Sequence, residues 1–359
     1  MMIPFNRFSA RKTEKPAWHR YILWSLMGAT VLALIIGIKL YMVLFGTAIT
    51  LPADTYGHLY VRTGETLENI AEDMRKMGVH PRLREFKWVA HRKKLDQTLK
   101  PGHYVLTNGM SNFQLTRMLA LGRQTPVRVI FHNIRTIGQL AGRIASQIEA
   151  DSASLIKTFN DSVMLNKAGF NAATLPAMFI PNTYEVYWTL TPKEFFNRMH
   201  DEFNVFWDES RKKRCAEMGY SITQIVTLAS IVEQETNKNS EKSTIAGVYI
   251  NRLRKGMPLQ ADPTVKYAVG DFSLRRITGE HLTIDSPYNT YKYQGLPPGP
   301  ICFPSIASVE AVLNYEDHGY YYFCARDDLS GYHEFARDYN THMTNARRYQ
   351  RALNALGIK

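Results

Sequence analysis

The longest apolar stretch of the chain lies near its N-terminus. Residues 21–38 read YILWSLMGATVLALIIGI, which is 18 residues without a charge, and after Lys39 the apolar character resumes through LYMVLFG. At about 1.5 Å of rise per residue, a helix of this length crosses a hydrocarbon core of about 30 Å. We therefore predict a transmembrane helix at residues 21–45. A buried soluble helix and a cleaved signal peptide are the alternatives, but the run exceeds the roughly 7 to 15 apolar residues of a signal sequence.

The pattern of residues 51–150 predicts a small α/β module. The strand candidate HLYVRTG (58–64) precedes TLENIAEDMRKMG (66–78), in which apolar residues keep helical spacing. A second helix after Pro81 and a strand in KPGHYVL (100–106) follow. Residues 127–148 add one strand and one amphipathic helix, as in a second copy of the pattern. The order strand, helix, helix, strand resembles the LysM-type fold, which binds N-acetylated glycans; a plain spacer module is the alternative.

Residues 151–359 alternate helical patterns with two short strands, which predicts an α+β domain. Strand candidates are YYYFCAR (320–326) and HEFAR (333–337), joined by the turn DDLSG. The predicted fold class is thus α+β, with one N-terminal transmembrane helix, a small LysM-like α/β module and a larger α+β domain, separated near residue 150. The predicted helices are 192–214, 222–236, 241–255, a short one after Ser305, and 338–353.

The charged residues ahead of the predicted membrane helix predict its orientation across the membrane. Five basic residues against the single acid Glu14 precede it: Arg7, Arg11, Lys12, Lys15 and Arg20. The positive-inside bias makes residues 1–20 a cytoplasmic tail and puts everything after about residue 50 outside. The net charge of +12 admits nucleic acid, an anionic membrane or an acidic polymer as partners. The external location and the lack of a recognition motif argue against nucleic acid.

Cysteine and histidine usage gives no sign of a metal site. Cys215, Cys302 and Cys324 are an odd number without a CxxC pair, so buried thiols are expected, with one disulfide as the alternative. The eleven histidines show no HxxxH or HExxH spacing. We expect neither a metal nor another cofactor.

The stretch LASIVEQET (228–236) carries two carboxylates one residue apart, Glu233 and Glu235. Ser221 and Gln224 fit a capping box that starts this helix at Ile222. At about 100° per residue, Glu235 falls on the most apolar face, and Glu233 lies about 160° away from it. The two acids therefore do not share a face of the helix.

The position of Glu235 is unfavourable for a charged carboxylate. Burial and the negative end of the helix dipole both raise its pKa, as a proton donor requires. The alternative is a side chain that bends into solvent or pairs with Arg252 or Arg254. Two further helices follow, the second with Asp262 and Pro263 as N-cap and first residue, so Glu235 would lie at a junction in the wall of a cleft.

A loop after these helices offers a surface for a sugar. SPYNTYKYQGLPPGPI (286–301) is rich in tyrosine, asparagine and threonine and is stiffened by prolines. Aromatic faces suit the C–H faces of a sugar ring, and amide and hydroxyl groups suit its hydroxyl edges. A rigid structural loop is the alternative.

Together, ASIVEQET (229–236), VYINRLRKGMPLQADPTVKYA (248–268), the loop 286–301 and HEF (333–335) with His342 resemble the endolytic murein transglycosylase family, also called MltG or YceG-like. The resemblance covers nearly the whole chain. It implies a peptidoglycan lytic transglycosylase, anchored in the bacterial cytoplasmic (inner) membrane with its catalytic domain (151–359) on the outer, periplasmic side. Its activity would be cleavage of the β-1,4 bond between N-acetylmuramic acid and N-acetylglucosamine in nascent glycan strands, which leaves a 1,6-anhydro end.

The resemblance also assigns roles to residues and partners. Glu235, the second glutamate of the ExE motif, is the implied catalytic acid, and one acid suffices if the substrate's own C6 hydroxyl is the nucleophile. Peptidoglycan strands are the implied substrate, and peptidoglycan synthases or penicillin-binding proteins are implied partners. Candidate substrate-binding and charge-supporting residues are Glu233, Gln260, Asp262, Asn289, Thr290 and Tyr291.

The chain departs from the family pattern at a few positions. Asn182 replaces a common aspartate, His132-Asn133 replaces a Glu-Gly pair, and Arg337 replaces a threonine after HEF. These departures concern substrate subsites more than the reaction class. Two other functions stay open: a muramidase that uses water with Glu233 as partner, and a non-catalytic membrane-tethered scaffold that binds peptidoglycan.

Overall fold

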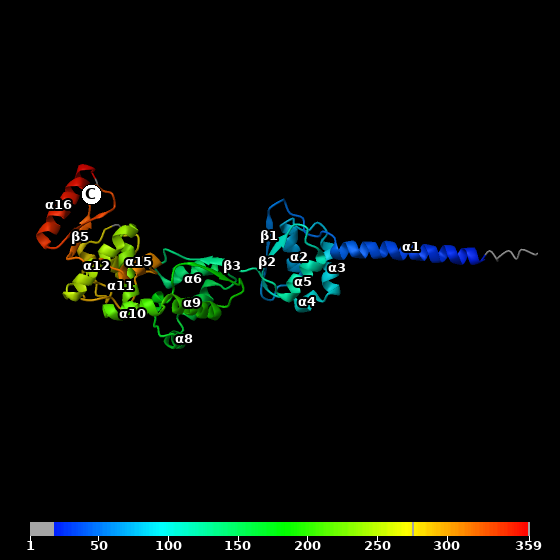
Figure 1. The fold of residues 1–359 in the computed structure, drawn as a ribbon, viewed down its shortest axis with the longest axis horizontal. Coiled ribbons are helices and arrows are strands. Elements are labelled where there is room, and N and C mark those ends of the chain that lie inside the picture. The colour runs from blue at the N-terminus through cyan, green and yellow to red at the C-terminus, as the bar shows by residue number, and fades with distance from the viewer. Residues whose placement is uncertain (1–17, 275, 358–359) are drawn as a thin grey trace, which may run out of the picture. The chain divides into compact units, whose positions relative to one another are not determined.

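The computed structural model describes residues 18–357 except residue 275 (Figure 1). The predicted cytoplasmic tail, 1–20, therefore lies outside the described residues except for its last three. The chain forms two compact units, Met1–Thr125 and Pro126–Lys359. In the described part, helices combine with two-stranded antiparallel sheets. The predicted α+β class is confirmed at this level.

The predicted membrane helix is present as α1, Trp18–Phe45. None of its residues is buried, and its length and hydropathy are those of a helix that can span a membrane. The last turn of α1 is attached to the rest of the first unit. Asn112 Nδ2 donates to the carbonyl of Val43 at 2.9 Å, and the rings of Phe45 and Phe113 lie 5.2 Å apart.

The remainder of the first unit has the predicted order of strand, helix, helix and strand. Its two strands pair antiparallel from Tyr56 opposite Thr107 to Val61 opposite Gly102. Helices cover the sheet around a core that includes Leu59, Ile70 and Phe86. Two helices were not predicted, the short α4 and α5. The elements are β1 (Tyr56–Val61), α2 (Leu67–Lys76), α3 (Leu83–Arg92), α4 (Leu95–Thr98), β2 (Gly102–Thr107) and α5 (Asn112–Leu121).

The second unit carries the larger core and all residues of the ExE and loop motifs. Its core contains residues from helices at both ends of the unit. A hairpin of two strands follows these helices and precedes one long helix. Its elements are β3 (Val127–Ile130), α6 (Ile137–Ala145), α7 (Ser152–Phe159), α8 (Ser162–Lys167), η1 (Leu175–Ala177), β4 (Thr183–Val186), α9 (Pro192–Phe206), α10 (Glu209–Met218), α11 (Ile222–Glu235), η2 (Asn239–Glu241), α12 (Lys242–Arg254), α13 (Asp262–Val269), α14 (Gly279–Leu282), α15 (Ile306–Leu313), β5 (Tyr322–Ala325), β6 (His333–Ala336) and α16 (Tyr339–Ala355).

The boundary between the units lies at residues 125 and 126, so the prediction of a boundary near residue 150 is wrong. Strand β3 pairs antiparallel with β4, from Val127 opposite Val186 to Ile130 opposite Thr183. Helix α6 also belongs to the second core. Residues 127–148 are thus not a second copy of the first module. Local periodicity missed this because the partner of β3 lies more than 50 residues further along the chain.

The single helix predicted at 192–214 is two helices, α9 and α10. The chain leaves α9 at Trp207, which is buried, and Asp208 caps α10 by accepting from the backbone N–H of Arg211 at 2.9 Å. An aspartate inside an amphipathic pattern did not signal a break, yet its side chain satisfies the first N–H groups of a new helix. The break turns the chain toward α11.

Helix α11 runs through the middle of the second core. Ser221 and Gln224 form the predicted capping box, and all residues from Ile225 to Val232 are buried. Buried Ser230 accepts from the backbone N–H of Ile301 at 2.9 Å, which fixes the end of the proline-rich loop on this helix. The thiol of Cys302 reaches the carbonyl of Ser230 at 3.4 Å. All three cysteines are free, and Cys324 alone is only half-buried.

We expect Gly299→Ala to lower the free energy of unfolding by about 1–3 kcal/mol, because a Cβ at this position would overlap the carbonyl oxygen of Ala173. Gly142→Ala in α6 is the control. Its Cβ would meet nothing within 4 Å, and alanine should raise stability by about 0.5–1 kcal/mol. Denaturant unfolding followed by the fluorescence of Trp188 and Trp207 measures both. Equal effects of the two substitutions would contradict the packing of this loop.

Candidate active site

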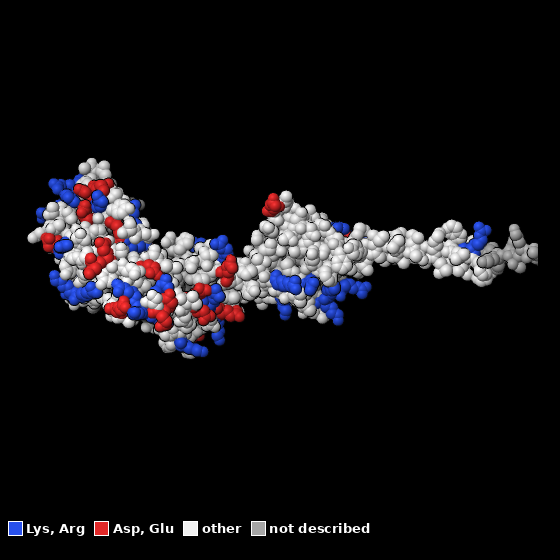
Figure 2. Space-filling view, in the orientation of Figure 1, with Lys and Arg blue, Asp and Glu red and all other residues white. Residues whose placement is uncertain are grey.

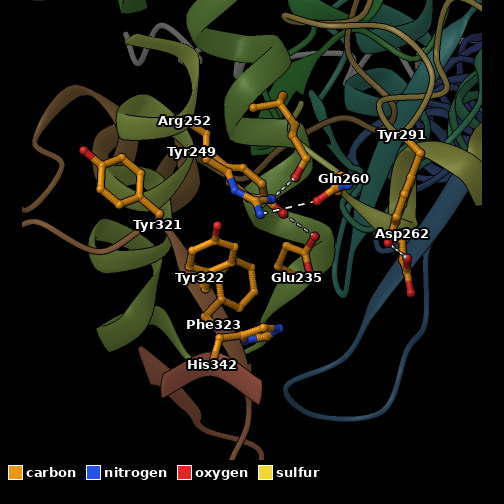
Figure 3. Close-up of a pocket in the computed structure, with 11 residues that line it drawn as sticks. Glu235, Tyr249, Arg252, Gln260, Asp262, Tyr291, Tyr321, Tyr322, Phe323 and His342 are labelled. Atoms are coloured by element: carbon orange, nitrogen blue, oxygen red, sulfur yellow. Dashed lines mark hydrogen bonds between the residues drawn. The ribbon is translucent and has the colours of Figure 1, made fainter. Parts of the chain in front are cut away.

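Glu235 is the last residue of α11 and lies at the wall of a cavity of about 300 Å³ (Figure 3). The cavity is built from the end of α11, from α12, from the start of α13 and from the β5 strand. Carboxyl, guanidinium, amide, phenol and imidazole groups share it with aromatic rings. The lining residues are Glu235, Tyr249, Arg252, Leu259, Gln260, Asp262, Tyr291, Tyr321, Tyr322, Phe323 and His342.

The surroundings of Glu235 favour its protonated form. Burial raises the pKa of Glu235 to about 7; the hydrogen bond from Tyr249 opposes this shift, and the nearby charge of Asp262 adds to it. The phenol of Tyr249 donates to Glu235 Oε1 at 2.6 Å. Glu235 keeps some accessible surface because it lines the cavity. The predicted rise in pKa is confirmed, and a carboxyl of this kind can donate a proton near neutral pH.

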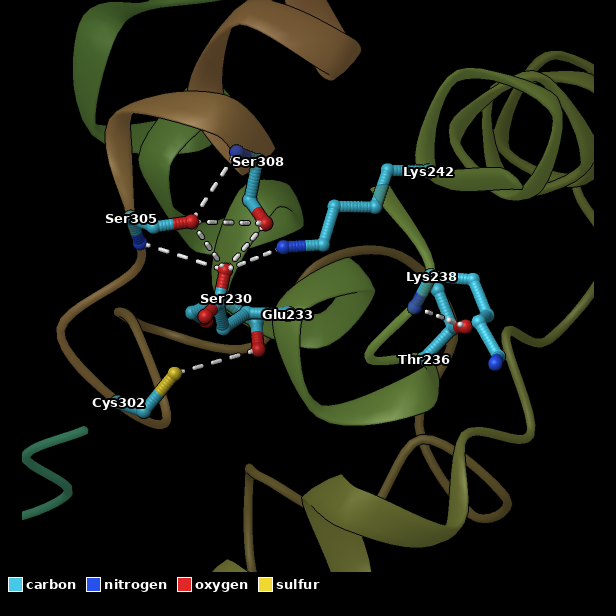
Figure 4. A network of polar contacts seen from close by, with 8 residues as sticks. All are labelled: Ser230, Glu233, Thr236, Lys238, Lys242, Cys302, Ser305 and Ser308. Atoms are coloured by element: carbon cyan, nitrogen blue, oxygen red, sulfur yellow. Dashed lines mark hydrogen bonds and ion pairs between the residues drawn. The ribbon is translucent and has the colours of Figure 1, made fainter. Parts of the chain in front are cut away.

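Glu233, two residues earlier, has the opposite environment (Figure 4). Its Oε2 accepts from Lys242 Nζ at 3.0 Å, from Ser305 Oγ at 2.6 Å and from Ser308 Oγ. Burial alone would raise the pKa of Glu233, but these donors outweigh it and hold the pKa below its usual value. Glu233 is therefore a charged structural residue that joins α11 to α12 and α15.

Arg252 brings a buried cation to the cavity. Its side chain is 8% exposed, Nη1 donates to the carbonyl of Leu259 at 2.6 Å, and Nη2 lies 3.5 Å from Gln260 Oε1. The Nε–H has no hydrogen-bond partner, and the guanidinium carbon lies 5.3 Å from the Tyr322 ring. Within the described residues Glu235 has no hydrogen bond or ion pair with Arg252 or Arg254. Arg254 instead contacts Tyr315 at 2.8 Å, so the predicted alternative pairing of Glu235 is wrong.

The hairpin of β5 and β6 closes another side of the cavity. Tyr322 stacks on the ring of His342 at 5.4 Å, and Phe323 meets Tyr249 edge to face at 5.8 Å. His342 Nδ1 is buried without a hydrogen-bond partner, and burial lowers the pKa of His342. The hairpin is fixed to η2 by Glu241, which accepts from the backbone N–H of His333 at 2.8 Å and contacts its ring at 3.0 Å.

Three of the predicted binding residues lie in the cavity with Glu235: Gln260, Asp262 and Tyr291. The phenol of Tyr291 donates to Asp262 Oδ1 at 2.6 Å. Asp262 is the first residue of α13, and Ala261 precedes it in the capping position, so the prediction of Asp262 as N-cap is off by one residue. Gln260 has a φ of 52°, a left-handed conformation that non-glycine residues rarely adopt.

Glu233, Asn289 and Thr290, the other predicted binding residues, do not line this cavity. Asn289 is 0% exposed, and its amide donates to the carbonyls of Leu282 and Ile284. Thr290 Oγ1, also buried, accepts from the backbone N–H of Ala261 at 3.0 Å. The Thr290 side chain thus holds the backbone next to Gln260, whereas the Asn289 side chain holds its own loop between Leu282 and Tyr291.

Several lining residues were not predicted as site residues. Tyr249 was included only in the motif 248–268, and Tyr321, Tyr322 and Phe323 only in a strand. The run YYYF in a short strand was the available signal for a role at the site. Side chains alternate between the two faces of a strand, so packing on one core face requires only every second residue to be aromatic. Arg252 was considered only as an ion-pair partner of Glu235, and His342 only as part of the family resemblance.

The departures from the family pattern lie away from Glu235. Asn182, His132, Asn133 and Arg337 do not line its cavity. Asn133 lines a separate cavity of about 500 Å³, together with Glu233 and Gln234. Across residues 18–357, apart from 275, no group of three or more His, Cys, Asp or Glu side chains could hold a metal ion.

Comparisons with known proteins agree with these motifs. The YceG-like family matches residues 59–348. The endolytic murein transglycosylase of Bacillus subtilis (strain 168) is 28% identical over 304 residues, which cover 79% of this chain and 84% of the relative. That of Streptococcus pneumoniae (strain ATCC BAA-255 / R6) is 27% identical over 335 residues, covering 82% of this chain and 59% of the relative.

A solved structure is also similar. The 2.6 Å crystal structure of a YceG-like protein from Listeria monocytogenes matches with a TM-score of 0.55 and 26% identity, over 80% of this chain and 98% of that chain. The family match includes every residue that lines the cavity of Glu235. The chain therefore belongs to the YceG-like family.

Proposed function

We propose that this protein is a peptidoglycan lytic transglycosylase that cleaves the β-1,4 bond between N-acetylmuramic acid and N-acetylglucosamine within glycan strands. Glu235 is its general acid and then its general base. The observation that carries the proposal is a carboxyl with a pKa of about 7 in a cavity lined by aromatic and polar groups. The names of the Bacillus and Streptococcus relatives support the same substrate class.

The reaction needs one proton to move out and one to return. Since Oε1 of Glu235 accepts from Tyr249, the acidic proton belongs on Oε2. Oε2 gives this proton to the glycosidic oxygen as the bond from that oxygen to C1 of the muramic acid breaks. The C6 hydroxyl of the same sugar then bonds to C1, and its proton returns to Glu235. The products are a 1,6-anhydro end and a free 4-hydroxyl, with no water consumed.

Other lining residues suit the remaining needs of this substrate. Arg252 lines the cavity and brings a positive charge that suits an acetamido or lactyl oxygen. Asp262, held by Tyr291, places negative charge where the oxocarbenium-like transition state carries positive charge. The rings of Tyr321, Tyr322 and Phe323 offer apolar faces to the sugar.

The first unit suits a tethered glycan-binding module. Helix α1 fits a single-pass membrane anchor. The basic residues ahead of it support an N-terminus in the cytoplasm and a location outside the bacterial inner membrane for the chain that follows α1. The strand, helix, helix, strand order of the first unit supports a LysM-like role in holding the strand. Peptidoglycan synthases are the class of protein that would supply that strand.

A muramidase that uses water is the second candidate function. Asp262 is the only other carboxylate among the residues that line the cavity, so it replaces Glu233 as the possible second acid. Two carboxylates are what most glycosidases require. Water addition would leave reducing ends instead of anhydro ends, and the two products differ by the mass of one water.

Mass spectrometry of the products tests the function. Purified protein is expected to release anhydro-muropeptides from peptidoglycan, and Glu235→Gln to lower their release by about 10²–10⁴-fold, because the amide cannot donate the proton. Strand binding by Glu235→Gln should persist. Reducing ends would support the muramidase, and product formation unaffected by Glu235→Gln would refute the assigned role of Glu235.

Glu233→Gln tests whether Glu233 has a structural role, in contrast to the proposed catalytic role of Glu235. Glu233→Gln removes the anionic partner of buried Lys242 and is expected to lower the melting temperature. Glu235→Gln should not lower it at neutral pH. A wild-type protein that binds strands but yields no product would instead establish the scaffold function.

The pKa of Glu235 predicts a pH dependence of stability. Burial raises it from 4.5 to about 7, so the folded chain binds this proton more tightly than the unfolded chain. The resulting stabilisation is complete below about pH 4.5 and is lost as the pH rises through about 7. Between pH 5 and 8, the stability of Glu235→Gln relative to wild type should rise by about 2–3 kcal/mol. Glu209→Gln, at a 92% exposed side chain, should show no such change in urea unfolding.

Tyr249 should set the alkaline limit of activity. Wild-type turnover is expected to fall as the pH rises through about 7, when Glu235 loses its proton. Tyr249→Phe removes the hydrogen bond that lowers this pKa, so the alkaline limb of the pH–rate profile should move to higher pH. Tyr187→Phe, at an exposed tyrosine outside the cavity, is the control. An unshifted limb in Tyr249→Phe would contradict the role of this hydrogen bond.

A further inference from the structure

A groove of about 360 Å³ lies between α1 and α3 in the first unit. Its floor is apolar, from Leu40 and Val43 of α1 and the ring of Trp88, which is 44% exposed. Its charged groups are Lys39, Arg84 and Glu85. Glu85 is paired with Arg82 at 3.5 Å, which leaves two cations at an apolar groove.

The two cations have no direct ionic partner in the described part of the chain. Neither Lys39 nor Arg84 takes part in an ion pair or side-chain hydrogen bond there. Lys39 ends the 18-residue run of α1 that carries no charge. An unpaired lysine beside hydrocarbon is costly, so an anion at this position would remove an energetic penalty.

The length of α1 predicts where the groove lies relative to the membrane. The charge-free run of 18 residues spans about 27 Å at 1.5 Å per residue, close to the roughly 30 Å hydrocarbon core. Residues from Lys39 onward then reach the headgroup layer. The attachment of α5 to the last turn of α1 agrees, because the polar helices of the first unit cannot enter the hydrocarbon.

The surface next to the groove is basic. Residues 82–100 contain seven lysines and arginines against two acids. Figure 2 shows blue side chains gathered over the α3 and α4 face of the first unit, close to α1. Arg92 lies over the Trp88 ring at 5.7 Å, which extends the positive charge along α3. Such a face is attracted to a membrane surface that carries negative charge.

We infer that this groove binds one anionic phospholipid of the leaflet that surrounds the C-terminal end of α1. An acyl chain lies along Ile36 and Leu40 toward the hydrocarbon, and the headgroup phosphate lies between Lys39 and Arg84, near Val43 and Trp88. The bound lipid completes the charge balance at the end of the membrane helix and orients α3 on the membrane surface. The inference rests on the proposed membrane placement of α1, not on the chemistry of Glu235.

Native mass spectrometry of the full chain in detergent tests the site. The protein is titrated with phosphatidylglycerol or with phosphatidylcholine of the same acyl chains. One phosphatidylglycerol should bind per chain, at least about fivefold more tightly than phosphatidylcholine. Arg84→Ala should weaken phosphatidylglycerol about fivefold and leave phosphatidylcholine unchanged. Lys76→Ala, at an exposed cation of α2 outside the groove, should change neither.

Two further arms identify the source of the anion and the role of the acyl chain. Glycerol 3-phosphate in water should not compete, and Val43→Trp, which fills the groove, should weaken both lipids. Equal binding of the two lipids, equal effects of Arg84→Ala and Lys76→Ala, or full competition by glycerol 3-phosphate would each overturn the site.

Separate measurements keep this inference apart from the proposed function. Alkaline extraction of membranes from cells that express the full chain reports whether α1 is inserted, and release of anhydro-muropeptides reports the chemistry. If insertion and product release are normal while lipid selectivity is absent, the groove alone is wrong. If alkaline extraction releases the full chain from the membrane, α1 is not inserted. The membrane placement is then wrong, and the lipid site is overturned with it.

Discussion

The second unit is organised around one requirement, a carboxyl at the end of a buried helix that holds its proton up to about pH 7. Helix α11 carries eight successive buried residues before it reaches Glu233 and Glu235. Desolvation raises the pKa of both acids, and their hydrogen-bond donors and neighbouring charges distinguish them. Glu233 receives donors from two serines and a lysine, whereas Glu235 receives one phenol. One helix end thus holds a permanent charge and a titrating acid side by side.

The donors of Glu233 also assemble the walls around Glu235. Lys242 begins α12, which supplies Tyr249 and Arg252, and Ser305 and Ser308 belong to the start of α15. Glu241, adjacent to Lys242, holds the hairpin through His333. The charged acid therefore fixes α12, whose Tyr249 and Arg252 line the cavity of Glu235. In the proposed function, structural and chemical roles are divided between two residues of one motif.

What the sequence could predict was local. The capping box of α11, the ends of α1 and the unequal faces of Glu233 and Glu235 all depend on residues within a few turns of one another. The partner of Glu235 is 14 residues away, and the strand that pairs with β3 is more than 50 away, so neither leaves a periodic signal. Asn289 and Thr290 were misassigned because amide and hydroxyl groups satisfy buried backbone as readily as they bind sugars.

The left-handed backbone of Gln260 has a consequence for how this protein can evolve. A φ of 52° costs a side-chain-bearing residue about 1 kcal/mol or more, and glycine would avoid that cost. Glycine, however, would remove the amide oxygen next to Arg252 and loosen the chain between α12 and α13. Under the proposed function, selection for thermal stability alone would favour a different residue here than selection for turnover. Position 260 would then be a place where adaptation to heat and retention of activity conflict.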